Sequence, residues 1–391
     1  MDFSFTREDE AFREEVASFV ERELPWDWRE RSVDPEEPED AILVKQFKKK
    51  LSENGWLTMA WPQEYGGQAA PHIKQVVFNE EMAYRGVPAG DAGVRMVGPI
   101  LMLYGTEEQK RYFLPRIGQA DIDWAQGYSE PDAGSDLASL QTRAVEDGDD
   151  FVVTGSKIWN GAHAGADWMF MLARTDPDAP KHRGISVFIV DMDTPGIEVR
   201  PILNMFDVHY FNQVFFDNVR VPKSNMIGER DRGWYVAATS LDFERSGVGR
   251  FASNQRSLEE LIQVAKETEV GGRTLSGDPV IRHRLAELWT ANEAGRAVAY
   301  NVAWMQSQGE VPNKEASASK LLGSEIAQRI HGLGVQMARM YGILDKGSKW
   351  APLNGRLARE WMDSISFTIR AGTSEIQRNI IATRGLGLPR G

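Results

Sequence analysis

The segment RAGTSEIQRNII, residues 370–381, has the composition of a tight turn that leads into a helix. Gly372 gives the turn conformational freedom, and Ser374 with Gln377 has the spacing of a capping box. Capping alone would explain these residues, but a Gly-Thr-Ser turn also presents free backbone N–H groups, with which chains bind phosphate. Because Ala371 has no acid–base chemistry, a reaction at this turn needs a base from elsewhere in the chain.

Two further segments combine turn-forming residues with side chains that could contact a ligand. GYSEPDAGSDLASLQTRA spans residues 127–144, and a polar loop explains its composition as well as a binding loop does. GSKIWNGAHAGADW spans residues 155–168, where a tryptophan after a strand is more often part of a core than a cofactor platform. The chain has no cysteine and its 6 histidines lack ligand spacing, so no metal site and no cysteine nucleophile is predicted.

The bulk composition is that of a globular protein with room for two or three domains. The chain has 391 residues, of which 42% are hydrophobic and 26% charged. A net charge of −12 disfavours nonspecific binding to nucleic acid. No apolar run approaches the roughly 20 residues of a membrane helix, and the N-terminal residues do not have the pattern of a signal peptide. The sequence therefore predicts a cytoplasmic protein with no membrane span and no nucleic-acid partner.

The pattern of apolar residues changes twice along the chain. Residues 1–120 have helical periodicity, with Phe12, Val16 and Phe19 at helical spacing. Residues 121–232 contain short segments rich in Val, Ile and Phe between turn signals, which predicts an antiparallel barrel or sandwich. Residues 233–391 are helical again, contain no evident strand and have segments long enough for a bundle. The predicted fold class is α+β, with domain boundaries near residues 120 and 232.

The three segments, in this order and on this helix–strand–helix background, resemble the acyl-CoA dehydrogenase family. The motifs EPDAGSD and GTSEIQR carry the resemblance, which covers nearly the whole chain. It implies an N-terminal helical domain, a central antiparallel β-domain and a C-terminal four-helix bundle. FAD would lie between the β-domain and the bundle, with part of the site supplied by a neighbouring subunit. The family oxidises an acyl-CoA thioester to the trans-2-enoyl-CoA, as in the beta-oxidation of fatty acids, and passes electrons to an electron-transfer flavoprotein.

The resemblance assigns cofactor contacts in the middle of the chain residue by residue. Tyr128 and Ser129 match residues whose backbone and hydroxyl hold the flavin ring. Ser135 matches a position near the flavin phosphates and bound CoA, and Trp159 matches the tryptophan beside the ring. The family commonly has a hydroxyl residue in the loop that follows, so Asn160-Gly161 is a departure that leaves backbone contacts to the flavin.

The resemblance assigns further contacts near the C-terminus. Thr373 matches a phosphate-binding threonine, and Glu375 occupies the position of a residue that reaches the adenosine ribose. Gln336 matches a glutamine that reaches FAD across the subunit interface, but residues 337–340 read Met-Ala-Arg-Met where other members have a Gly-Gly pair. Arg273, in the loop EVGGRTLSG, is the candidate for the arginine that binds the pyrophosphate.

The resemblance also suggests where the missing base lies. Many members have a glutamate at the position of Ala371, whereas isovaleryl-CoA and long-chain acyl-CoA dehydrogenases have it on the first long bundle helix. In LDFERSGVG, Glu244 falls at that position and the expected Arg245 follows it. The predicted chemistry has Glu244 remove the α-proton and the β-hydrogen leave as hydride to flavin N5. The thioester carbonyl accepts hydrogen bonds from the Ala371 N–H and a ribityl hydroxyl. Asp242 is a candidate contact to bound CoA.

Simpler or different interpretations stay open at this point. A Glu-Arg pair on a helix is usually solvated, and a surface role explains Asp242 equally well. The alternatives to a dehydrogenase are an acyl-CoA oxidase that uses oxygen and a partner subunit of a mixed assembly; a DNA-associated relative is disfavoured by the acidic charge. A homotetramer is the family default, with a dimer or a mixed tetramer as alternatives. Steroid side chains, aromatic acids, dicarboxylates and ordinary fatty acids all remain candidate acyl groups.

Overall fold

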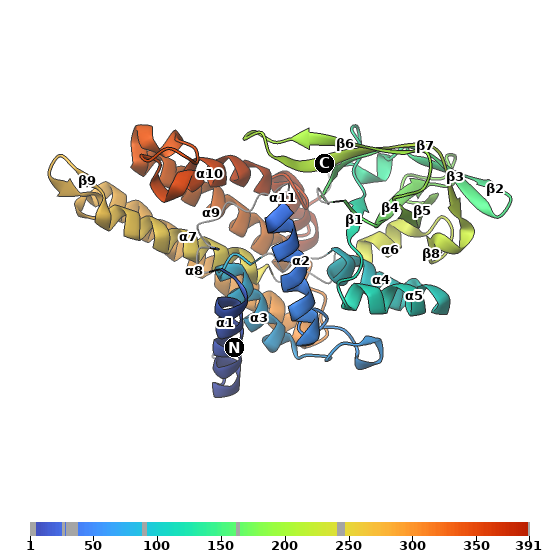
Figure 1. Cartoon of the computed structure of the whole chain (residues 1–391), viewed down its shortest axis with the longest axis horizontal. Helices are drawn as coiled ribbons and strands as arrows, with labels where there is room; N and C mark the ends of the chain where they lie inside the picture. The colour runs from blue at the N-terminus through green and yellow to red at the C-terminus, as the bar shows by residue number, and fades with distance from the viewer. Residues whose placement is uncertain are drawn as a thin grey trace. The chain divides into compact units, whose positions relative to one another are not determined.

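The chain folds into two compact units, each assembled from segments that are distant in sequence (Figure 1). The computed structural model describes residues 5–25, 28, 38–87, 92–161, 165–240 and 247–389. The first unit comprises Met1–Ser32, Pro71–Pro88 and Arg245–Gly391, and the second comprises Val33–Ala70 and Ala89–Glu244. The N-terminal helices are therefore shared between the two units, whereas the three-domain division predicted from the sequence stays a prediction.

The first unit is built from helices. The long helices α7, α8 and α9 run side by side in Figure 1, α10 and α11 pack against α9, and α3 packs against α7 and α8. The bounds are α1 (Arg7–Glu23), α3 (His72–Tyr84), α7 (Val248–Glu267), α8 (Pro279–Ser307), α9 (Lys314–Ala338), α10 (Arg356–Phe367) and α11 (Ser374–Ile380).

Apolar periodicity explains how these helices pack. In α1, Phe12, Val16 and Phe19 are all buried, as their spacing predicts. In α7, Phe251 is fully buried and its ring lies against α8 at Gly295, where an added Cβ would come within 2.2 Å of the ring. The glycine therefore sets how closely these two bundle helices approach.

A short hairpin interrupts the helices of this unit, so the prediction of no strand after residue 233 is wrong. β9 (Glu269–Val270) pairs antiparallel with β10 (Arg273–Thr274). The two residues between them, Gly271 and Gly272, have φ of 61° and 77°. A pair of glycines with positive φ suits a two-residue hairpin turn, and this signal is present in the sequence.

The second unit combines a sheet with helices. Its sheet has the strand order β6-β7-β3-β2-β4-β5-β8, with β1 paired to β4. The helix α6 packs on β5. The strands are β1 (Trp124–Gly127), β2 (Arg143–Asp147), β3 (Asp150–Asn160), β4 (Trp168–Arg174), β5 (Ile185–Asp191), β6 (Ile197–Leu203), β7 (His209–Pro222) and β8 (Met226–Ile227). The helices are α2 (Pro38–Glu53), α4 (Gly98–Tyr104), α5 (Glu107–Gly118) and α6 (Gly233–Ser240).

The sheet is mainly antiparallel, as predicted, with parallel pairing where β4 meets β1 and β2. The continuous apolar runs of β4 and β5 are buried on both faces, and Met169, Met171 and Phe188 are fully buried. The α+β fold class is therefore confirmed. Across the part of the chain that the structure describes, no helix is long and apolar enough to cross a membrane.

A buried carboxylate joins three helices of the first unit. Glu80 on α3 is 3% exposed and accepts hydrogen bonds from Arg13 Nη2 at 3.1 Å, Arg296 Nε at 2.9 Å and the Tyr300 hydroxyl at 2.6 Å. These donors come from α1 and α8. Burial and the Glu80 carboxylate raise the pKa of Tyr300, which keeps its hydroxyl a donor. The carboxylate therefore ties the N-terminal helices to the bundle.

We expect Glu80→Ala to lower the free energy of unfolding by about 3–5 kcal/mol, because it leaves buried cationic donors without their acceptor. Urea titration followed by circular dichroism measures the change. Glu287→Ala is the matched control, since Glu287 pairs with Arg329 between α8 and α9 but is 52% exposed. That change should cost less than about 1 kcal/mol. Equal losses in the two variants would contradict the special role of Glu80.

Candidate functional site

The C-terminal turn is the first part of the candidate site. Ala371 has φ of 55° and Gly372 has φ of 85°, so two successive residues adopt the left-handed conformation before α11. The N-cap of α11 is Thr373, whose hydroxyl accepts from the Ile376 N–H at 3.2 Å. The predicted capping box of Ser374 and Gln377 is therefore wrong by one residue. Thr373 has the extended backbone of an N-cap, whereas Ser374 is already the first helical residue.

The turn presents unpaired backbone donors. Among the described residues, the N–H groups of Ala371, Gly372 and Thr373 find no protein acceptor, whereas the Ser374 N–H donates to the Thr368 carbonyl at 2.9 Å. Successive free N–H groups in a left-handed turn before a helix form a site for an anion or a polarised carbonyl oxygen. The donor chemistry that the sequence predicts for this turn is thus available.

Two side chains hold the turn through its carbonyl oxygens. Lys320 on α9 donates from Nζ to the Gly372 carbonyl at 2.6 Å and to the Phe367 carbonyl at 3.1 Å. Gln377 Nε2 lies 3.3 Å from the Ala371 carbonyl and 3.4 Å from the Gly372 carbonyl. The carbonyl groups are thereby occupied while the neighbouring N–H groups stay free. Glu375 is exposed beside the turn, and its own backbone N–H and the Thr373 hydroxyl lower the pKa of its carboxyl.

A second candidate segment is the loop after β1, in the other unit. Tyr128 is buried against Phe170, and the Ser129 carbonyl accepts from the Ile158 N–H at 2.9 Å. Lys157 on β3 is fully buried and donates to the Tyr128 carbonyl at 3.2 Å and to Glu130 Oε1 at 2.7 Å. Hydrogen bonds from Ile158 and Lys157 of β3 therefore hold the loop.

The carboxylate of Glu130, the acidic member of this buried pair, has backbone donors in addition to Lys157. Glu130 also accepts from the backbone N–H groups of Gln141 at 2.6 Å and Thr142 at 2.9 Å. Burial opposes ionisation of Glu130, but Lys157, the Gln141 N–H and the Thr142 side chain lower the pKa of its carboxyl. Burial lowers the pKa of Lys157 to about 8, against the opposite effect of Glu130. The pair closes the EPDAGSD loop onto the sheet.

Trp159 lies on a bulge at the end of β3. The pairing of β3 with β7 shifts between Ile158 and Asn160, and Trp159 at this shift has φ of 63°. Its side chain is 57% exposed and meets Phe211 edge-on, with 5.9 Å between the ring centroids. A bulky residue with positive φ is a true backbone outlier, and bulges often redirect side chains at functional sites. The strain turns a large aromatic surface outward rather than into the core.

The residues after Trp159 differ in their surroundings. The Asn160 side chain is buried, donates to the Gln126 carbonyl at 2.5 Å and leaves its Oδ1 without a partner among the described atoms. Gly161 is exposed, and an added Cβ would meet nothing within 4 Å. Ser135 is also exposed, within the EPDAGSD loop.

Gln336 and Arg273 lie apart from the C-terminal turn. Gln336 is exposed near the end of α9, where its Oε1 accepts from Arg284 at 2.6 Å. Arg273 is exposed on β10, and its side chain forms no hydrogen bond or ion pair with any described residue. Within this chain, neither residue lies at the turn. Their predicted roles as contacts to FAD stay predictions.

Glu244, Arg245 and Asp242 lie outside the described residues, which resume at Gly247 after Ser240. The predicted single helix through this region is wrong at Gly247, because its φ of 67° is incompatible with a continuous right-handed helix. α7 begins at Val248.

Sequence reasoning missed the two buried lysines that hold the site loops. Lys157 is buried on β3, like Phe151 and Val153. It lies an even number of residues from each of them, so the alternation of the strand places all three on the same face. Lys320 lies on the apolar face of α9, between the buried Ala316 and Gly323. The signal in the sequence was a lysine at a position where the pattern of the strand or helix predicts a buried side chain.

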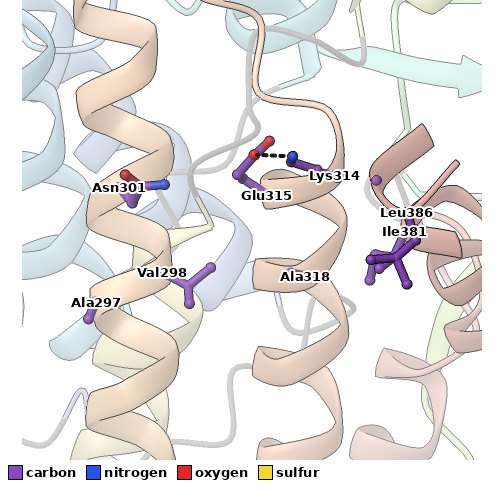
Figure 2. A pocket seen from close by; sticks show the side chains of 9 residues that line it. Ala297, Val298, Asn301, Lys314, Glu315, Ala318, Ile381 and Leu386 are labelled. Carbon is purple, nitrogen blue, oxygen red and sulfur yellow. Dashed lines mark ion pairs between the residues drawn. The ribbon is translucent and has the colours of Figure 1, made fainter.

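A pocket of about 630 Å³ opens on the first unit between α8, α9 and the segment after α11 (Figure 2). Lys314 and Glu315 on α9 form an ion pair of 3.7 Å at its edge. The sequence-predicted site residues do not line it. The lining residues are Ala297, Val298, Asn301, Lys314, Glu315, Ala318, Ile381, Gly385 and Leu386.

Three family models match the chain in succession. The acyl-CoA dehydrogenase N-terminal domain matches residues 6–121, the middle domain residues 125–219 and the C-terminal domain residues 231–386.

Relatives match the whole chain or most of it. The acyl-CoA dehydrogenase FadE26 of Mycobacterium tuberculosis is 35% identical over 100% of this chain and 99% of its own length. The acyl-CoA dehydrogenase IpdE1 of the same organism is 36% identical over 88% of each chain. Two solved structures, the Tcur3481–Tcur3483 steroid ACAD and the ChsE4–ChsE5 complex from Mycobacterium tuberculosis, each reach a TM-score of 0.90 at 35% identity over 100% of both chains. The chain therefore belongs to the acyl-CoA dehydrogenase family of FAD-binding oxidoreductases.

Proposed function

We propose that this enzyme oxidises an acyl-CoA thioester to the trans-2-enoyl-CoA, with Glu244 as the base and an electron-transfer flavoprotein as electron acceptor. The observation that carries the proposal is the turn at Ala371, whose N–H is free and is held by a strained backbone. A thioester carbonyl that accepts this N–H becomes polarised, which acidifies the neighbouring α-carbon.

Features of both units support the fit of FAD. The Ala371–Thr373 turn supplies free N–H groups, and Trp159 supplies an exposed aromatic face. The unpaired Oδ1 of Asn160 leaves a buried polar atom beside this tryptophan. When bound, FAD supplies the acceptor for the hydride that leaves the β-carbon. The Tyr128–Glu130 loop would orient the flavin ring, with Ser135, Asn160-Gly161, Thr373, Glu375, Gln336 and Arg273 as the further proposed contacts.

The alanine at residue 371 supports a base elsewhere in the chain. Alanine cannot accept a proton, so the α-proton must go to a carboxylate from another segment. The match of LDFERSGVG to the family members with a base on this segment supports Glu244. We propose that Arg245 and Asp242 act on the substrate side of the same segment, with Asp242 toward bound CoA.

Relatives suggest a class of substrate and of acceptor. One structural relative is called a steroid ACAD, which supports a CoA thioester of a steroid-derived acid as the first substrate to test. Another solved structure, titled as an electron transferring flavoprotein of Acidaminococcus fermentans, has a TM-score of 0.84 at 27% identity. This title names the class of electron acceptor that we propose, whereas a structure titled the prolyl acyl carrier protein oxidase AnaB, with a TM-score of 0.83 at 28% identity, keeps oxygen as the alternative to test.

A second candidate is a role as one subunit of a mixed assembly. The names of two structural relatives each pair two different proteins, which favours this arrangement over the homotetramer expected from the sequence. The flavin content and native mass of the purified chain decide between them. A flavin-loaded homotetramer that reacts with thioesters on its own would exclude the mixed assembly.

We expect wild-type protein to lose its oxidised-flavin absorbance under anaerobic conditions when mixed with a reactive thioester. A panel of steroid, aryl, dicarboxylic and straight-chain acyl-CoAs identifies the class, and we expect the steroid thioester to react fastest. Glu244→Gln should bind the thioester but react about 10²- to 10⁴-fold more slowly, because general-base catalysis contributes about that much. Stopped-flow absorbance measures both rates.

Glu267→Gln is the matched control for this series, since Glu267 is exposed at the end of α7 and should leave the rate unchanged. A Glu244→Gln variant as fast as wild type would show that another carboxylate is the base. Rapid oxygen consumption by the reduced enzyme would instead identify an oxidase.

We expect Lys157→Met to purify with less than about half of the wild-type flavin. The change removes the donor to the Tyr128 carbonyl and leaves Glu130 buried without its cation, which destabilises the loop. The ratio of flavin to protein absorbance measures occupancy. Lys181→Met is the control, because Lys181 pairs with Asp136 of the same motif but is 61% exposed. Full occupancy in Lys157→Met would contradict a role for the pair in holding the flavin loop.

A further inference from the structure

The side chain of Lys320 is buried directly behind the C-terminal turn. Only 7% of the residue is exposed, and Nζ donates to the carbonyl groups of Phe367 and Gly372 at 3.1 Å and 2.6 Å. Phe367 is the last residue of α10, and Gly372 lies one residue before the N-cap of α11. One ammonium therefore fixes both ends of the connection that contains Ala371.

These bonds also set the direction of the free N–H groups. In a planar trans peptide the C=O and N–H point in opposite directions, so a carbonyl drawn toward α9 turns the next N–H away from it. Lys320 does this to the peptide between Gly372 and Thr373. Gln377 acts on the same carbonyl and on that of Ala371, at 3.4 Å and 3.3 Å. The Gly372 and Thr373 N–H groups are therefore oriented by side chains that bond only the carbonyl side of each peptide.

The charge of Lys320 is poorly compensated. Among the described residues it forms no ion pair, in contrast to Lys157 with Glu130. Burial, together with the positive charges of Arg250 and Arg370, lowers the pKa of Lys320 to about 8. Glu325, on α9 itself, and Glu375, on α11, act in the opposite direction; Glu325 is engaged by Arg378 at 2.6 Å.

We propose that Lys320 is the positioning residue of the thioester-binding turn: its ammonium orients the Thr373 N–H and fixes both ends of the connection that carries the Ala371 N–H, without contact to the substrate. This inference rests on the proposed function, which assigns the Ala371 N–H to the thioester carbonyl. A charge-assisted hydrogen bond is about twice as strong as a neutral one, so the turn is held most firmly while Lys320 is protonated. The rate of α-proton removal should therefore fall as the pH rises through about 8.

The fall in rate would not reflect unfolding caused by this group. The pKa of Lys320 is about 8 in the folded chain, below its ordinary value of 10.5. Between these values the unfolded chain binds more protons at Lys320 than the folded chain does. The contribution of Lys320 to stability therefore rises with pH in this window while its hold on the turn weakens. Rate and stability change in opposite directions, which separates positioning from a purely structural role.

The test compares wild type, Lys320→Met and Lys320→Arg in the rate of anaerobic flavin reduction by the reactive thioester, from pH 6 to pH 10. We expect the wild-type rate to fall above about pH 8. Lys320→Met should be slower by about tenfold to a hundredfold at pH 7, because a small misplacement of a catalytic donor costs up to about that much, and should lack the alkaline fall. Lys320→Arg keeps its charge throughout, so it should retain most of the rate and lose the fall below pH 10.

Lys314→Met is the control on the same helix, since Lys314 is 52% exposed, and it should match wild type at every pH. An alkaline fall that keeps its midpoint in Lys320→Arg belongs to another group, such as Lys157, and would overturn the proposal. A full rate in Lys320→Met at pH 7 would overturn it as well.

A second measurement does not depend on catalysis. Hydrogen exchange followed by mass spectrometry reports the amides of residues 366–378 in each holoprotein. We expect Lys320→Met to speed their exchange by about tenfold at pH 7 relative to wild type, because local opening becomes easier. If no thioester reduces the wild-type flavin, the proposed function fails but exchange still tests the hold of Lys320 on the turn. Unchanged exchange would refute that hold.

Discussion

Each loop of the candidate site lies over a buried lysine that donates to its backbone carbonyl oxygens. Lys157 is fully buried under the Tyr128–Glu130 loop, and Lys320 is 7% exposed under the Ala371 turn. Taking an ammonium group out of water is costly, so such a group persists only where fixed acceptors surround it. Those acceptors are the carbonyl groups of the site loops. The same bonds that satisfy the lysines therefore fix the loops and leave other groups of the loops free for a ligand.

The two lysines differ in how their charge is balanced. Glu130 lies 2.7 Å from Lys157 and is itself held by two backbone N–H groups, so this pair is closed on all sides. Among the described residues, Lys320 has only carbonyl partners at hydrogen-bond distance, and the positive charges of Arg250 and Arg370 act against its own. Loss of its proton removes this repulsion and weakens its two hydrogen bonds. The Tyr128–Glu130 loop is thus suited to permanent support of a cofactor. The hold of Lys320 on the Ala371 turn instead responds to the charge around it.

The sequence predicted what depends on local pattern and missed what depends on tertiary partners. The stripe of Phe12, Val16 and Phe19 predicted a helix because periodicity is a local property, but it could not tell that α1 packs against α3. Motif matching found the turn at Gly372, yet two adjacent hydroxyl residues left the N-cap ambiguous by one position. The buried role of Lys320 depends on α10 and α11 lying against α9, which no local pattern specifies.

Backbone strain occurs in both candidate segments. In the part of the chain that the structure describes, few residues other than glycine have positive φ, and Trp159 and Ala371 are among them. A residue with a Cβ in this conformation costs about 1–3 kcal/mol, which neighbouring bonds must offset. At Ala371 the Gln377 and Lys320 bonds to adjacent carbonyl groups do so. The side chain gains nothing from the strain, because a methyl group neither bonds nor ionises. What the strain preserves is a turn in which the Ala371 N–H has no acceptor among the described residues. The proposed function therefore assigns residue 371 to binding through its backbone and leaves proton removal to another segment.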